Sequence, residues 1–233
     1  MASETTAEQP GFYARAAVPI WDKIAGAPPS ESLDLVSPDG KTSVAAHYDE
    51  DKGVTLQISG RLGVHEVDLG PGVGSELLWS PNSDAFAVTT SDDGANGNYR
   101  TIVVSSEARG FVVKDLTPLV EAAFGHPVKC GSPEDPNVGA FRWTGPDEIV
   151  AAAEIVSHSN CDSFGTFRAY AIDLRAMRVV KTFDQIEAKR RFSSSLGAEL
   201  RSAPDECVRS PRRCWVSTNH PRAPSRGGAR QAP

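Results

Sequence analysis

Short apolar runs separated by turn residues recur along the chain between residues 33 and 184. In the clearest stretch four runs follow one another: Leu77–Trp79, Ala85–Thr90, Ile102–Val104 and Phe111–Val113. The second run alternates, so that Phe86, Val88 and Thr90 share one face. Runs of this length, rich in Val, Phe, Ile and Thr and bounded by turn residues, predict four consecutive antiparallel strands.

A weaker copy of this four-strand unit lies on each side. The first copy has runs at Leu33–Val36, Val44–Tyr48, Val54–Ile58 and His65–Leu69, and the third at Ala140–Trp143, Ile149–Val156, Thr166–Ile172 and Val179–Phe183. Pro38 and Pro81 stand 43 residues apart, and an insertion at 117–138 lengthens the next interval. A period near 40 residues with four strands per unit is typical of β-propeller blades.

The turn after the first strand carries Ser37-Pro38-Asp39-Gly40-Lys41 in the first copy and Trp79-Ser80-Pro81-Asn82-Ser83 in the second. Proline presets the φ angle of a tight turn, and Asp-Gly supplies a hydrogen-bonding side chain and a positive φ. These turns resemble the Trp-Ser-Pro-Asp-Gly-Lys turn of TolB-type, WD-like propeller repeats over roughly residues 33–184. The first copy has Val36 in place of Trp, and the third departs at Thr144-Gly145-Pro146.

We therefore expect an all-β fold of three four-stranded, propeller-like blades. Because closed propellers use about four to eight blades, the ring is expected to be open or incomplete. Terminal segments that cover the strand edges, a homodimer and a compact β-sandwich are the alternatives. Short helices are expected at 117–125, with Thr117 as N-cap, Pro118 in the first turn and Gly125 beyond the end, and after residue 184.

The domain boundaries follow from the repeat. Residues 1–30 form an N-terminal extension whose segment 12–24 has enough apolar residues to dock on the core, and 31–184 form the propeller-like domain. Residues 185–203 are expected to form one amphipathic helix, with Ile186, Leu196 and Leu200 near helical spacing. Residues 204–233 are basic and expected to be largely disordered, either as a native tail or as the product of a truncation.

The charge distribution indicates which classes of binding partner to expect. The net charge is −6, but residues 193–233 hold seven Arg against three acidic residues, so the first 192 residues carry −10. Nothing in this balance favours nucleic acid. The apolar runs are too short to span a membrane, and no signal peptide is recognisable, so we expect a soluble protein and leave its compartment open.

The loops that join the second and third strands of propeller blades emerge on one face, which is the usual binding surface. Here that face would carry Asp49, Asp51, Asp92, Asp93, Asn96, Asn98 and His158. The sequence therefore predicts an acidic face that binds a protein or peptide partner. The oxygen-rich segment 92–98 also allows calcium, although it lacks the alternation and terminal Glu of an EF-hand loop.

The cysteines leave three interpretations open. Cys130 and Cys161 fall on the same face, with His126 and His158 close before them, which allows a disulfide, unlinked thiols or a tetrahedral zinc site. Cys207 and Cys214 are close enough for a small loop disulfide. Two local bridges would favour a periplasmic or secreted protein.

Motifs for catalysis are absent from the sequence. No Gly-x-Ser-x-Gly motif occurs, and Gly70–Gly74 precedes a predicted strand instead of the helix that a dinucleotide loop requires. Trp79 and Trp143 are predicted to pack between blades. The favoured hypothesis is a non-enzymatic binding module without a cofactor. The alternatives are a metal-dependent enzyme or hydrolase that uses the loop His, Cys and Asp residues, and a structural fragment that dimerises through open strand edges.

Overall fold

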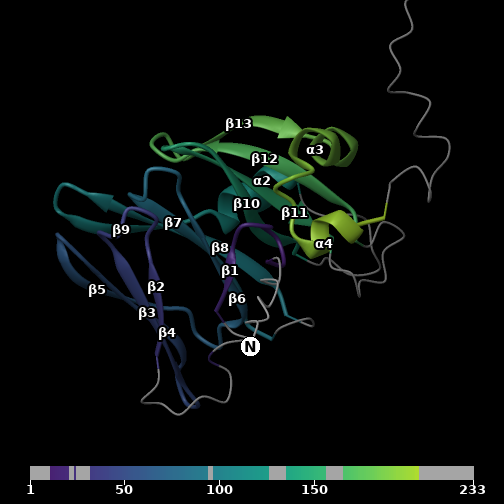
Figure 1. The fold of residues 1–233 in the computed structure, drawn as a ribbon. Coiled ribbons are helices and arrows are strands. Elements are labelled where there is room, and N and C mark those ends of the chain that lie inside the picture. The colour runs from purple at the N-terminus through teal and green to yellow at the C-terminus, as the bar shows by residue number, and fades with distance from the viewer. Residues whose placement is uncertain are drawn as a thin grey trace, which may run out of the picture.

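The computed structural model describes residues 11–20, 24, 32–93, 97–125, 135–155 and 165–204. Three antiparallel sheets make up most of the fold (Figure 1). Sheet one is the meander β2 (Ser32–Val36), β3 (Ser43–Asp49), β4 (Gly53–Gly60) and β5 (Gly63–Asp68). Sheet two is β6 (Val73–Trp79), β7 (Ala85–Ser91), β8 (Tyr99–Glu107) and β9 (Gly110–Asp115), with the short β1 (Val18–Pro19) beside β6. Sheet three is β10 (Asn137–Gly145), β11 (Glu148–Glu154), β12 (Phe167–Asp173) and β13 (Arg178–Phe183).

The prediction of a mostly β fold with three units of four strands is confirmed. Each of the twelve predicted runs falls on one observed strand, and each unit is a simple meander. None of the three sheets closes on itself.

Sheet two is packed on both faces. Leu77, Phe86 and Val88 pack in a cluster with Leu35, Leu56 and other side chains of sheet one. The alternate positions, such as Leu78 and Val103, pack with Ile149 and Tyr170 of sheet three. Every residue of β7 is therefore buried, and sheet two lies between the other two sheets (Figure 1). Alternate side chains of β7 thus face sheet one and sheet three, and neither set faces solvent.

The first two repeats fold their turns in the same way. Ser37 N donates to Thr42 O at 2.8 Å, and Ser80 N donates to Ala85 O at 2.9 Å. In each turn the serine hydroxyl donates to a side chain two residues later and accepts the backbone N–H five residues later. The positive φ falls at Gly40 in the first turn, at 74°, and at Ser83 in the second, at 64°. The two sequence motifs therefore encode one turn structure.

The tryptophan prediction is confirmed by a hydrogen bond for Trp143 and, for Trp79, by its packing against the cluster between sheets one and two. Trp143 Nε1 donates to Leu78 O at 3.2 Å, which joins sheet three to sheet two. Trp79 packs edge-on against Phe86, at 5.1 Å between ring centroids, on the side that faces sheet one. Each tryptophan thus contributes to the packing against the preceding sheet.

The helices differ in detail from the prediction. Helix α2 (Thr117–Phe124) ends at Gly125 as expected, but its N-cap is Leu116. The Thr117 hydroxyl instead accepts from Thr101 N in β8, at 3.0 Å, so it ties the helix to sheet two.

After residue 184 the expected single helix is two helices, α3 (Gln185–Phe192) and α4 (Ala198–Ser202). They are separated because Gly197 N donates to Tyr13 O, at 2.6 Å, outside any helix. Ile186, expected on the buried face, is 50% exposed, whereas Gln185, Ala188 and Phe192 are buried.

Residues 11–20, which we call the N-terminal strap, cover the inner edge of sheet two. Val18 pairs with Leu77 and Pro19 with Glu76, so β1 extends the sheet at β6. The docking of this segment on the core was predicted and is confirmed by Tyr13 and Ile20, both fully buried. Covering of a strand edge by a terminal segment was one of the alternatives drawn from the sequence, and it holds for β6.

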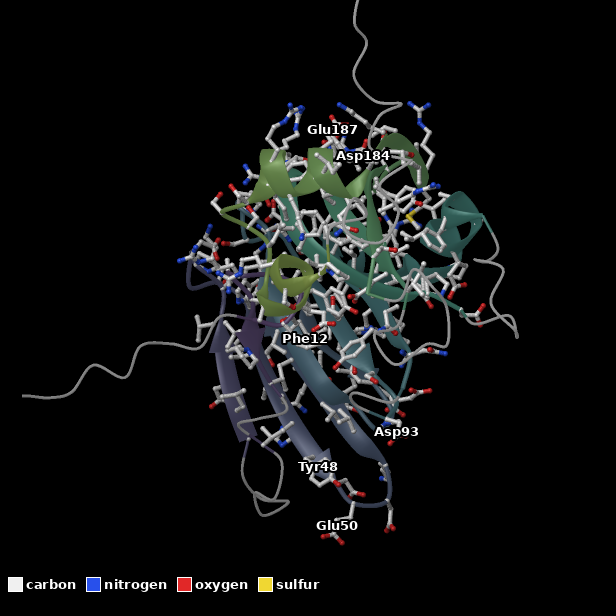
Figure 2. All side chains as sticks on the ribbon, turned by 90° about the vertical axis from the view of Figure 1, so that its right-hand side faces the viewer. Phe12, Tyr48, Glu50, Asp93, Asp184 and Glu187 are labelled. Atoms are coloured by element: carbon white, nitrogen blue, oxygen red, sulfur yellow. The ribbon has the colours of Figure 1, made fainter. Side chains whose placement is uncertain are left out.

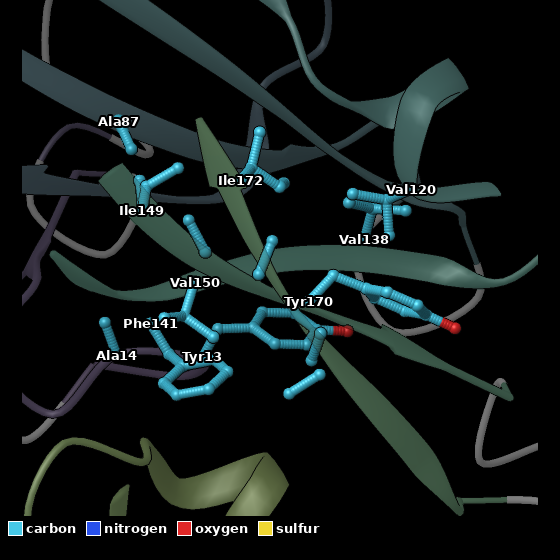
Figure 3. Close-up of a cluster of buried hydrophobic side chains, with 14 of the residues drawn as sticks. Tyr13, Ala14, Ala87, Val120, Val138, Phe141, Ile149, Val150, Tyr170 and Ile172 are labelled. Carbon is cyan, nitrogen blue, oxygen red and sulfur yellow. The ribbon is translucent and has the colours of Figure 1, made fainter. Parts of the chain in front are cut away.

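The outer face of sheet three is also covered. Phe192 of α3 packs against Phe141 and Phe183, with ring centroids 5.6 and 5.1 Å apart. Tyr13 of the strap lies beside Phe141 and Val150 (Figure 3). A further sheet could not stack here without displacing the strap and the helices.

The outer face of sheet one, in contrast, has no buried residue along its alternate positions: Ser32, Asp34, Val36, Ser43, Ala45, His47, Thr55, Gln57, Ser59, Val64, Glu66 and Asp68. Among the described residues, the stack of three sheets is therefore covered at one end and open at the other.

Candidate binding surface and a buried carboxyl cluster

The connections of sheets one and two place acidic residues at one end of the molecule. The β2–β3 and β6–β7 turns meet where Asp39 N donates to Ser83 Oγ, at 3.2 Å. Because both sheets are antiparallel meanders, the β3–β4 and β7–β8 connections lie at the opposite ends of their strands. Figure 2 shows Glu50 and Asp93 toward that end, far from Asp184 and Glu187. We call this end, with Asp49, Glu50, Asp51, Asp68, Asp92 and Asp93, the acidic loop end.

Three of these carboxylates hold the turns in shape. Asp49 Oδ1 accepts from the backbone N–H groups of Asp51 and Lys52, at 2.9 and 3.0 Å. Asp92 Oδ1 accepts from Asn98 N at 3.0 Å, and Asp68 Oδ1 accepts from Gly70 N at 2.7 Å. These contacts follow the usual role of aspartate in turns. The predicted site residues Asp49, Asp92 and Asn98 are therefore structural parts of the surface.

The remaining side chains point to solvent without a partner among the described residues. Glu50, Asp51 and Asp93 are exposed, and no ion pair or side-chain hydrogen bond engages their carboxylates within the described ranges. Some acids elsewhere on the described surface form ion pairs, as in Asp39 with Lys41 at 2.9 Å and Asp147 with Arg175 at 2.7 Å. The acidic loop end is thus a concentration of negative charge that its own cations do not neutralise.

Several predicted site residues cannot be placed. Asn96, His126, Cys130, His158, Cys161, Cys207 and Cys214 lie outside the described residues, as does the basic tail from residue 205. The disulfide, zinc and tail interpretations therefore stay predictions. Within the described part of the chain, no group of three or more His, Cys, Asp or Glu side chains is arranged to hold a metal ion. The same residues contain no helix long and apolar enough to cross a membrane.

A buried carboxylate, Glu76 of β6, binds the N-terminal strap through its backbone. Its two oxygens accept from the N–H groups of Phe12, Tyr13 and Ala14, at 2.5, 3.0 and 3.0 Å. The side chain is almost fully buried. Burial raises the pKa of Glu76 to about 7, and the three N–H donors act in the opposite direction because they stabilise the charged form.

A second buried carboxyl, Glu154 of β11, contacts the same strap through a side chain. Tyr13 Oη donates to Glu154 Oε2 at 3.0 Å, and Glu154 Oε1 is buried without a hydrogen-bond donor. Burial, together with the charge of Glu199 in α4, raises the pKa of Glu154 to about 8. The pKa of Tyr13 is raised by its own burial and by Glu154.

Sequence patterns gave little sign of these two residues. Glu154 does interrupt the longest apolar run, Ile149–Ile155, and a charged residue in such a run is a signal of a buried polar contact. Glu76 precedes Leu77 in a predicted strand whose boundary was placed one residue too late to include it. Their partners come from segments more than 60 residues away, so no local pattern could identify them.

Comparison with protein-family models finds no matching family, and no curated protein matches the chain. The resemblance to TolB-type, WD-like repeats therefore stays a prediction from the turn residues.

Proposed function

We propose that the protein is a non-enzymatic, propeller-like binding module whose acidic loop end recognises a Lys- or Arg-rich segment of a protein or peptide. The observation that carries this proposal is the concentration of six carboxylates beside only Lys52 and Arg100, with none of Glu50, Asp51 and Asp93 paired among the described residues.

The geometry of the turns favours recognition by charge. Asp49 and Asp92 fix the two loops by hydrogen bonds to the backbone, so the exposed acids next to them project from an ordered support. A fixed array of like charges raises the local concentration of a cationic partner and speeds its encounter. Because single exposed ion pairs contribute only about 0–1 kcal/mol, several carboxylates must act together.

The propeller-like part of the proposal is supported by repetition. Two turns share one hydrogen-bond pattern, and three consecutive meanders stack face to face in chain order. In this arrangement the connections between the second and third strands form a surface that differences in loop sequence can adapt to different partners.

Two labelled probe peptides, octa-arginine and octa-glutamate, test the proposal by fluorescence anisotropy. We expect octa-arginine to bind at about 0.05 M salt and to lose most of its affinity at about 0.5 M, because screening shortens the reach of exposed charges. Octa-glutamate should not bind. Equal binding of the two peptides, or binding of neither, would contradict the proposal.

No observation within the described residues favours the other two hypotheses. The metal-dependent enzyme would use His126 and His158, which lie outside those residues. Dimerisation through open strand edges stays a prediction. Among the described residues the structure leaves the outer face of sheet one uncovered, but this is a sheet face and not a strand edge.

A further inference from the structure

The strap is held between two parts of the molecule that are distant in sequence. On one side Glu76 binds its backbone N–H groups. On the other side Gly197 and the first two residues of α4 bind its carbonyl groups: Gly197 N donates to Tyr13 O, Ala198 N to Gly11 O and Glu199 N to Phe12 O. The strap and α4 therefore hold one another on sheet three.

Glu154 lies where these parts meet. It projects from β11 toward the strap, where Tyr13 Oη donates to its Oε2. Its Oε1 is buried and accepts no hydrogen bond, and Glu199 of α4 is the charged group that acts on it. As a carboxylate, Glu154 would be a buried charge with one oxygen unsatisfied, which is unfavourable. A proton on Oε1 removes the charge.

We propose that Glu154 holds a proton that closes a latch between β11, the strap and α4, and that loss of this proton loosens the strap and α4 as the pH rises. This inference is independent of the acidic loop end. In the closed state the neutral Glu154 accepts from Tyr13 of the strap, and the strap in turn accepts from Gly197, Ala198 and Glu199, so the three elements are linked. In the open state the outer face of sheet three, with Phe141 and Val150, loses part of its cover.

Four other titratable or charged side chains among the described residues lie around the latch: Tyr13, Tyr99, Arg142 and Glu76. From the strap the titratable neighbour is Tyr13, and from β8 it is Tyr99, which lies 5.3 Å from Tyr13 between ring centroids. The cation on the same face, Arg142, donates to Ser195 Oγ at 2.8 Å. Glu76 of β6 is a second buried acid that contacts the strap, but its three N–H donors remain good partners when it is ionised.

The direction of the pH effect follows from proton binding. The closed state holds the Glu154 proton up to a pH near 8, whereas a solvent-exposed glutamate loses it near 4.5. The latch is therefore fully closed at acidic pH. Between those values the equilibrium constant for local opening should rise about tenfold per pH unit for the one proton released.

Hydrogen-exchange mass spectrometry on the full chain tests the proposal. The measured quantity is the protection factor of the amides of Gly197, Ala198 and Glu199 between pH 5 and pH 9, with Val88 in β7 as reference. We expect protection at 197–199 to fall at least about tenfold per pH unit up to pH 8 and to stay below the protection of Val88, which also falls because global unfolding releases the same proton.

Glu154→Gln removes the proton but keeps the contact with the strap, because the amide oxygen can accept from Tyr13. In this variant protection should fall less steeply with pH, by about a factor of ten per pH unit. Glu76→Gln should keep the part of the slope that is due to Glu154. An unchanged slope in Glu154→Gln, no slope in the original protein, or equal protection factors at Val88 and at 197–199 would each overturn the proposal. If Glu154→Gln does not fold, Glu199→Gln serves instead: it should move the fall in protection to lower pH, and an unmoved fall would overturn the proposal.

Discussion

Tyr13 Oη lies 3.0 Å from Glu154 Oε2, a contact between two residues 141 positions apart in the chain. It joins the N-terminal strap to the central part of sheet three, and the Tyr13 ring packs flat over Gly139 of β10. The strap is thereby an integral part of the core, although it belongs to none of the three repeats. Four predictions follow from this packing and from the repeated turns.

Replacing Tyr13 tests the contributions of its hydroxyl and its ring separately. Tyr13→Phe removes the donor to Glu154 but keeps the ring, so we expect a loss of about 1–3 kcal/mol in the free energy of unfolding. Tyr13→Ala also leaves a cavity, and about 3–5 kcal/mol should be lost. Urea denaturation measures both. Equal losses in the two variants would mean that the ring contributes nothing.

Gly139→Ala tests whether the strap needs close contact with β10. A Cβ at Gly139 would lie 2.1 Å from the Tyr13 ring, which is buried and cannot move without leaving its place. We expect a loss of more than about 2 kcal/mol, in the range of overpacked cores. Gly145→Ala in the same strand is the matched control, because nothing lies within 4 Å of its Cβ position. Similar thermal stability of the two variants would contradict the packing described here.

The equivalence of the two turns predicts equal effects of equivalent substitutions. Ser37→Ala and Ser80→Ala each remove a hydroxyl that accepts one backbone N–H and donates to one side chain. Each should lower the free energy of unfolding by about 1 kcal/mol, measured by denaturant titration. Ser202→Ala, at an exposed hydroxyl, should change it by less than about 0.5 kcal/mol. A large effect at only one of Ser37 and Ser80 would show that the turns are not equivalent.

Stability should fall as the pH rises through neutrality. The pKa of Glu76 is about 7 in the folded protein against 4.5 for a free glutamate, so the folded state binds this proton more tightly than the unfolded state. The resulting stabilisation is fully present below pH 4.5 and is lost as the pH rises through 7. Tm should therefore be lower at pH 8 than at pH 6, with a smaller difference in Glu76→Gln. A Tm that rises over this interval would contradict this account of the buried acid.

The sequence predicts the sheets well because the signals for them are local. Runs such as Ala85–Thr90 end at turn residues whose hydrogen bonds lie within five positions, as at Ser80. The helix after residue 184 was predicted less well, since contact between Gly197 and Tyr13 interrupts it.

The two buried acids depend on contacts between distant segments. Glu76 meets the amides of Phe12, Tyr13 and Ala14, and no spacing in the sequence connects them. The acidic character of the loop end, in contrast, was predictable, because Asp92 and Asp93 lie in a connection between two recognisable strands. The sequence alone could not show which of these acids hold the turns by hydrogen bonds and which remain exposed.

The most direct test of the proposed function is charge reversal at the exposed acids of the loop end. Glu50→Lys, Asp51→Lys and Asp93→Lys, combined in one variant, leave the turn contacts of Asp49 and Asp92 in place. The control reverses three surface acids at or beside other turns, Asp84, Glu107 and Asp147, of which the last two form ion pairs with Lys114 and Arg175. In anisotropy titrations at low salt, the loop-end variant should bind octa-arginine at least about tenfold more weakly than the control, since several charge pairs are lost together. Equal affinity of the two variants for octa-arginine would contradict binding at the acidic loop end.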